Sequence, residues 1–149
     1  MEIKQKLYNK CVSLVEEKLE LLQKAIDESQ KALSSESKST AGDKHETGRA
    51  MIHLEMEKNG KVFAETNKLK KVLAQLNPDK KCNKVELGAL IKTNKGNYYL
   101  SISLGKLEID NENYFALSPV SPLAKQMLGL KGGSEFEFNR NKFRIQEIN

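Results

Sequence analysis

Aromatic residues, cysteine and long apolar runs are scarce in this sequence. Of its 149 residues, 6% are aromatic and none is tryptophan, which argues against a large sandwich or barrel. No run of 18 or more apolar residues occurs, and the N-terminus MEIKQKLYNK lacks the apolar core of a signal peptide. Cys11 and Cys82 form no CxxC motif, so we expect free thiols and a cytoplasmic location.

Common enzyme and cofactor motifs are absent as well. The sequence contains no dinucleotide-binding glycine fingerprint, Walker sequence, HExxH motif or calcium loop. His45 and His53 lie eight residues apart without a nearby cysteine, so surface histidines are expected rather than a zinc site. The net charge of +5 is spread over both halves, whereas a nucleic-acid-binding domain usually concentrates its basic residues.

Proline is absent before Pro78, and two long amphipathic patterns occupy that part of the chain. Apolar residues recur at three- and four-residue steps, as they do on one face of a helix. The first stripe comprises Ile3, Leu7, Cys11, Leu14, Val15, Leu21, Leu22, Ala25, Ile26, Ala32 and Leu33, and the second comprises Met51, Leu54, Val62, Leu69, Leu73 and Leu76, with Ile52, Met56 and Phe63 alongside. Gly60 is the weak point of the second helix.

Two helices of similar length with a polar segment between them predict an antiparallel hairpin. Each helix is about 45 Å long at 1.5 Å per residue, and the two stripes bury each other as in a coiled coil. The connecting turn and its acidic residues, at 34–46, then form the tip of the hairpin. We place the end of this domain at residue 77, because proline does not continue a helix.

The second half, 78–149, predicts a small antiparallel sheet with one short helix. Strand-like segments are 84–93, 98–104, 113–117, 134–138 and 142–148. Between them, Ser121-Pro122 is typical of a helix start, with serine as N-cap and proline at the first helical position. The chain is therefore expected to belong to the α+β class.

The predicted tip carries three carboxylates, Glu36, Asp43 and Glu46, of which Asp43 and Glu46 form a closely spaced pair. Three residues apart, they are able to supply part of the oxygen shell of a divalent cation, although two side chains do not complete it. The same residues also fit a capping box, with Asp43 as N-cap and Glu46 at N3. Local sequence alone favours the cap, and the two interpretations are compatible.

Taken together, these segments resemble the bacterial Gre transcript-cleavage factors over nearly the whole chain and in the same order. The tip AGDKHETGRA resembles the family's Gly-Asp followed two residues later by Glu-Asn. VELGALIKT is similar to the strand that opens the family's C-terminal domain. SPVSPLAKQMLGLKGGSEFEF is similar to its Ser-Pro segment and final hairpin.

The resemblance implies an N-terminal antiparallel coiled coil and a C-terminal domain of FKBP-like shape. It also implies a partner, RNA polymerase, bound through the C-terminal domain near Ser121 and Pro122. The coiled coil then enters the secondary channel, where Asp43 and Glu46 help to hold Mg²⁺ jointly with the polymerase and promote hydrolysis of backtracked RNA. On this account the chain is a monomer, contacts the RNA 3′ end only inside the complex, holds no cofactor alone and is no enzyme by itself.

After Glu46 the sequence departs from the family, whose members continue with Asn, Ala, an acid and Tyr. Here Thr47, Gly48, Arg49 and Ala50 follow. A Gre-like regulator that occupies the channel without cleavage therefore stays open as an alternative. A coiled-coil adaptor unrelated to transcription stays open too, and a prolyl isomerase is the weakest alternative, because fold shape does not bring an activity.

Overall fold

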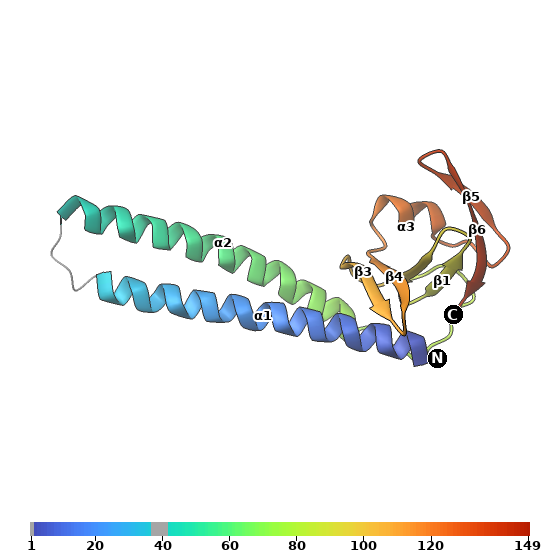
Figure 1. The fold of residues 1–149 in the computed structure, drawn as a ribbon, viewed down its shortest axis with the longest axis horizontal. Coiled ribbons are helices and arrows are strands. Elements are labelled where there is room, and N and C mark those ends of the chain that lie inside the picture. The colour runs from blue at the N-terminus through green and yellow to red at the C-terminus, as the bar shows by residue number, and fades with distance from the viewer. Residues whose placement is uncertain (1, 37–41) are drawn as a thin grey trace. The chain divides into compact units, whose positions relative to one another are not determined.

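The chain forms two long helices followed by six strands and a short helix, so the predicted α+β class is confirmed. The structure is a computed structural model that describes the backbone of residues 2–36 and 42–149 and the side chains of residues 3–35 and 46–149. The elements are α1 (Glu2–Glu36), α2 (Gly42–Ala74), β1 (Leu90–Thr93), β2 (Asn97–Leu100), β3 (Gly105–Ile109), β4 (Glu112–Leu117), α3 (Pro122–Met127), β5 (Glu135–Phe138) and β6 (Asn141–Ile148) (Figure 1).

Two compact units divide the chain. One comprises residues 1–13 and 71–149, and the other comprises residues 14–70. The start of α1 and the end of α2 thus belong to the same compact unit as the sheet. The predicted division into a hairpin domain, 1–77, and a C-terminal domain, 78–149, stays a prediction.

The helical unit consists of the facing parts of α1 and α2, which run side by side (Figure 1). On α1 the less exposed positions recur at heptad spacing from Val15 through Leu19, Leu22 and Ile26, as expected for a coiled-coil seam. The partly buried apolar residues of α2 in this unit are Ile52, Met56, Val62, Phe63 and Leu69, and near the end of α1 Ala32 and Leu33 are partly buried as well.

Three residues of the predicted apolar stripes lie outside this seam. Met51 and Leu54 are each 67% exposed and Leu21 is 62% exposed, so their assignment to the buried stripe was wrong. The residues that we placed alongside, Ile52 and Met56, face inward instead. The spacing of apolar residues on α2 is compatible with two adjacent faces, one with Met51 and Leu54 and one with Ile52 and Met56. The heptad contact with α1 selects the face with Ile52 and Met56.

Gly60 offers a test of the helical unit. The residue is exposed inside α2, and a methyl group added there meets no heavy atom within 4 Å. Because glycine loses more backbone entropy than alanine in a helix, Gly60→Ala should stabilise this unit by about 0.5–1 kcal/mol. Urea unfolding followed by far-ultraviolet circular dichroism measures the change, and an unchanged or lower midpoint would contradict it.

Strand order in the sheet is β3-β4-β2-β1-β6-β5. The neighbouring pairs are antiparallel apart from β2 and β4, which are parallel, so the antiparallel prediction misses one pairing. The parallel pair forms because β3, which the sequence pattern did not reveal, folds back on β4 at the edge. Asp110 and Asn111, with φ of 50° and 65°, make their two-residue turn.

The first strand is shorter than predicted. It begins at Leu90 rather than at residue 84, because Gly88 has a φ of +93°, a left-handed conformation that glycine adopts readily. Before it, Val85 pairs with the loop after α3 through the Val85 N–H to Leu130 O and Gly129 N–H to Val85 O bonds, both 2.8 Å. The final hairpin is confirmed, with a two-residue turn at Asn139 and Arg140.

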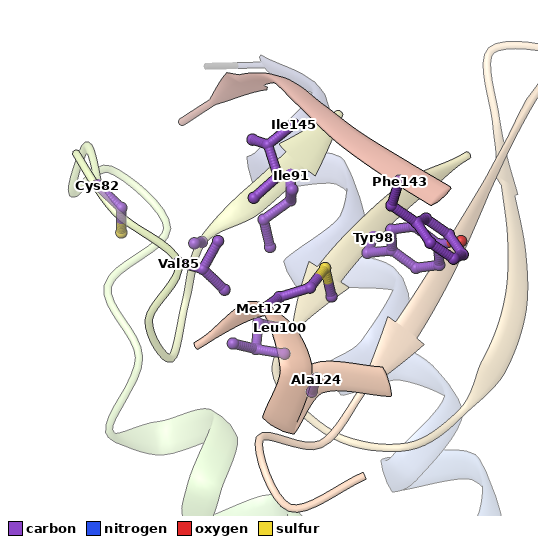
Figure 2. Close-up of a cluster of buried hydrophobic side chains, with 10 residues drawn as sticks. Cys82, Val85, Ile91, Tyr98, Leu100, Ala124, Met127, Phe143 and Ile145 are labelled. Atoms are coloured by element: carbon purple, nitrogen blue, oxygen red, sulfur yellow. The ribbon is translucent and has the colours of Figure 1, made fainter. Parts of the chain in front are cut away.

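The main core lies between one face of the sheet and α3 (Figure 2). Its fully buried members include Ile91, Leu100 and Ile145 from the strands and Ala124 and Met127 from α3. Alternate residues of these strands face away from it, as the pleat requires. This packing holds the central strands in place. The cavity described below lies on the other face of these strands, because Leu90 and Lys92 line it whereas Ile91 belongs to the core.

A second buried group includes Leu7 and Cys11 of α1, Leu73 of α2 and Tyr99 of β2. The Tyr8 hydroxyl donates to the Leu73 carbonyl oxygen at 2.8 Å, and Lys6 forms an ion pair with Asp110 at 2.9 Å. These contacts hold the first turns of α1 within the sheet unit. Cys11 is fully buried, which confirms its prediction as a core residue.

Burial raises the pKa of Cys11 to about 11 from 9.0. A raised thiol pKa contributes stability that is complete below the unfolded pKa and is lost as pH rises through the folded pKa. Between pH 8 and pH 10.5 the unfolding free energy should therefore fall by about 2 kcal/mol through this group alone. In Cys11→Ala, the fall in the free energy of urea unfolding over this pH range should be smaller by about 2 kcal/mol than in the wild type. An equal fall in the two proteins would contradict the assignment.

Candidate functional site

The predicted site residues Asp43 and Glu46 lie in the first turns of α2. The helix begins at Gly42, so both carboxylates belong to its N-terminal end, and the capping-box interpretation, which depends on the Asp43 side chain, stays a prediction. Residues three apart share one face of a helix, and the Glu46 side chain is exposed. The side chain of Asp43, and the connecting residues 37–41 of the predicted tip, lie outside the described residues.

Carboxylates near the start of a helix are favoured electrostatically. The unpaired N–H groups there carry a partial positive charge, which attracts negative side chains. Among the described side chains, no group of three or more histidine, cysteine or acidic residues lies close enough to hold a metal ion. Two carboxylates fit part of a Mg²⁺ shell, so the remaining oxygen ligands have to come from another molecule or from water.

Arg49 links the site region to the other helix, and sequence reasoning treated it only as a departure from the family. Its Nη1 atom donates to the carbonyl oxygen of Leu33 at 3.3 Å. Because α1 ends at Glu36, this carbonyl is one of the last four, which have no partner within the helix. The guanidinium both satisfies it and complements the negative end of the helix dipole.

Ser121 and Pro122 mark the start of α3, as predicted. Ser121 occupies the N-cap position with extended backbone angles, and Pro122 is the first helical residue. The serine side chain makes no capping bond; its hydroxyl donates instead to the Ser118 carbonyl oxygen at 2.8 Å. Pro122 is exposed, and the adjacent Val120 is 73% exposed. The pair is therefore accessible at this turn of the sheet unit.

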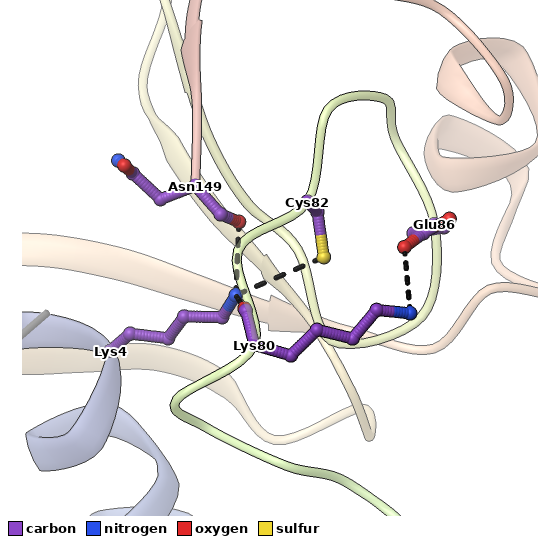
Figure 3. A network of polar contacts seen from close by, with 5 residues as sticks. All are labelled: Lys4, Lys80, Cys82, Glu86 and Asn149. Atoms are coloured by element: carbon purple, nitrogen blue, oxygen red, sulfur yellow. Dashed lines mark hydrogen bonds and ion pairs between the residues drawn. The ribbon is translucent and has the colours of Figure 1, made fainter.

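Lys4 forms a polar network that the sequence did not reveal (Figure 3). Its Nζ atom donates to the carbonyl oxygens of Lys80 at 2.6 Å and Asn149 at 3.0 Å, and lies 3.9 Å from the Cys82 sulfur. Burial lowers the pKa of Lys4 and raises that of Cys82. Lys80 in turn forms an ion pair with Glu86 at 3.2 Å, and this bond lowers the pKa of Glu86.

These contacts join segments that are distant in sequence. Lys4 comes from the first turn of α1, Lys80 and Cys82 from the loop after α2, and Asn149 follows β6. A lysine in an amphipathic helix gives no sign of such a role, because lysine is usually exposed. The only hint in the sequence is its place beside the apolar Ile3 and Leu7.

Comparison with known proteins adds little. No protein-family model matches the sequence, and no curated protein does. Among solved structures, the chain is similar to the transcription factor Gfh1, with 16% sequence identity, over 95% of this chain and 92% of that chain, at a TM-score of 0.34. Similarity at this level carries no argument. In the described part of the chain, no helix has the length and apolar character needed to cross a membrane.

Proposed function

We propose that this chain is a Gre-like transcription factor that acts on RNA polymerase and stimulates cleavage of backtracked RNA. The observation that carries the proposal is the position of Asp43 and Glu46 within the first turns of a 33-residue helix, next to the segment that connects it to a 35-residue helix. The resemblance of the tip and of the Ser121-Pro122 segment to the Gre factors supports it independently.

The helical unit suits delivery of carboxylates into a narrow channel. Its portion of α2, residues 42–70, is about 43 Å long at 1.5 Å per residue. A pair of helices is also thinner than a globular domain, since each helix with its side chains is about 10–12 Å across. Arg49 ties the two helices together near the carboxylates, which restricts the motion of the helix that bears them.

In the proposed complex, Asp43 and Glu46 would hold a Mg²⁺ ion jointly with the polymerase through their carboxylate oxygens. The bound ion would supply Lewis-acid activation of a water, as in two-metal phosphodiester hydrolysis. The chain itself is then a factor for another enzyme rather than an enzyme. Ser121 and Pro122 contribute to polymerase binding from the sheet unit.

The alternatives make different predictions for one assay. Purified chain is added to stalled elongation complexes with Mg²⁺ and labelled RNA, and both RNA length and co-purification with polymerase are measured. A stimulating factor binds and shortens the RNA from its 3′ end. A channel-occupying regulator binds without shortening it. A coiled-coil adaptor neither binds polymerase nor changes the RNA, and light scattering would show a dimer rather than the monomer that we expect.

A further inference from the structure

A cavity of about 220 Å³ lies in the sheet unit, against the first turn of α1 and the loop after α2. Its volume is below the roughly 300–1,000 Å³ of pockets that hold drug-sized ligands, so it suits a smaller molecule. Ile3, Pro78 and Leu90 provide apolar surface, while four lysines and three acidic residues surround them. The cavity is independent of Asp43 and Glu46.

The floor of this cavity is a row of polar residues that crosses four strands. Lys92 of β1 lies directly opposite Asn97 of β2 and opposite Glu147 of β6. Asn97 in turn pairs with Tyr114 of β4. Directly paired residues share one face of a sheet, and all four line the cavity. A carboxylate, an ammonium and an amide therefore stand on adjacent strands, which are about 4.8 Å apart.

Three members of this row have unused binding capacity. Tyr114 donates its hydroxyl hydrogen to Glu112 at 3.2 Å. In contrast, the side chains of Lys92, Asn97 and Glu147 have no hydrogen bond or ion pair to any residue in the described part of the chain. A ligand that supplies complementary groups therefore displaces water, not an existing contact within the protein.

Another part of the cavity lining is held in place by the buried Lys4. Its ammonium joins the carbonyl oxygens of Lys80 and Asn149, and all three residues line the cavity. Lys4 is 4% exposed, so this connection is shielded from competing water. Walls that are already fixed lower the conformational cost of binding.

The charges around the cavity select among small ligands. Four lysines against three acidic residues leave it nearly neutral, so a phosphate or other polyanion meets three carboxylates as well as the lysines. A molecule with one ammonium and one carboxylate on neighbouring atoms satisfies Glu147 and Lys92 together. An apolar substituent on the same molecule fits the surface formed by Ile3, Pro78 and Leu90.

We propose that this cavity binds a small zwitterion of the free α-amino acid class, with its carboxylate at Lys92 and Asn97 and its ammonium at Glu147. This inference does not depend on the proposed action on RNA polymerase. The apolar surface favours an aliphatic amino acid over glycine.

The test is a chemical-shift titration of the ¹⁵N-labelled full chain with L-leucine, glycine, sodium acetate, methylammonium chloride and inorganic phosphate. L-leucine should shift the amides of residues 92, 97 and 147 in a saturable way, more tightly than glycine. Acetate and methylammonium each supply only one of the two charges and should bind at least about tenfold more weakly, a difference of about 1.4 kcal/mol.

Charge-neutralising variants locate the site. Lys92→Gln and Glu147→Gln should each weaken L-leucine binding about fivefold, as expected for loss of one partly exposed charge pair. Lys106→Gln and Glu108→Gln remove the same charges from exposed positions of β3 that do not line the cavity, and they should leave binding unchanged. All four positions are exposed, so folding should be preserved.

Several results would overturn the proposal. One is the absence of saturable shifts with L-leucine up to roughly 100 mM, which would mean a binding free energy weaker than about −1.4 kcal/mol. Another is equal affinity for acetate or phosphate, which would indicate a simple anion site. Unchanged affinity in both Lys92→Gln and Glu147→Gln would place the ligand elsewhere.

Discussion

Replacement of both tip carboxylates, Asp43→Asn with Glu46→Gln, should reduce stimulated RNA cleavage by about 100-fold. Loss of groups that orient a catalytic metal typically lowers activity by this order. Binding to polymerase should persist, because Ser121 and Pro122 belong to the other compact unit. The rate of RNA shortening and the fraction of chain bound to stalled complexes measure the two effects separately.

A matched control for this pair is available on the same helix. Glu55→Gln with Glu65→Gln removes two negative charges from exposed positions of α2 that lie beyond its first turns. This variant should cleave at close to the wild-type rate. Equal loss in the two double variants would indicate a general effect of charge on channel entry, and the catalytic assignment would then fail.

The second large effect concerns the core of the sheet unit. Ile145→Ala removes a side chain of β6 that is fully buried in the core cluster formed by the sheet and α3. The lost burial and the cavity left behind should lower the unfolding free energy by about 2–5 kcal/mol. By comparison, Val120→Ala truncates a residue that is 73% exposed and should change it by less than about 0.5 kcal/mol.

Near-ultraviolet circular dichroism makes this measurement specific to the sheet unit. Tyr8, Tyr98, Tyr99 and Tyr114 are the four tyrosines of the chain, and all belong to the unit of residues 1–13 and 71–149. The urea midpoint of the tyrosine signal should fall in Ile145→Ala, while the far-ultraviolet helix signal need not follow it. An unchanged tyrosine midpoint would contradict the assigned core.

Much of the fold was predictable because its signals are local. The two helices follow from the three- and four-residue spacing of apolar residues, and α3 from Ser121-Pro122. The final hairpin follows from alternating segments around Asn139 and Arg140. Each of these patterns reflects an interaction within a few turns or between adjacent strands.

The missed features depend on distant partners. Met51 and Leu54 are as apolar as Ile52 and Met56, so only the approach of α1 decides which pair faces inward. Likewise β3 is recognisable only through its pairing with β4. Lys4 acquires its role from carbonyl groups 76 and 145 residues away.

The candidate site was predictable only in part. The spacing of Asp43 and Glu46 places them on one helix face, and the structure puts both in the first turns of α2. The significance of Arg49 was not predictable, because its acceptor is a carbonyl at the end of another helix. The polar row through Lys92 required the strand register, which no single segment contains.

The central claim is that Asp43 and Glu46 help to hold Mg²⁺ during RNA cleavage. The most direct measurement is the Mg²⁺ dependence of stimulated cleavage on stalled complexes, with wild type and with Asp43→Asn. If the carboxylates bind the ion, Asp43→Asn should need about 10- to 100-fold more Mg²⁺ for its half-maximal rate, as for loss of a group that supports metal binding. Excess Mg²⁺ should then restore part of the lost rate. An identical Mg²⁺ midpoint in the two proteins, or no cleavage by the wild type at any Mg²⁺ concentration, would contradict the claim.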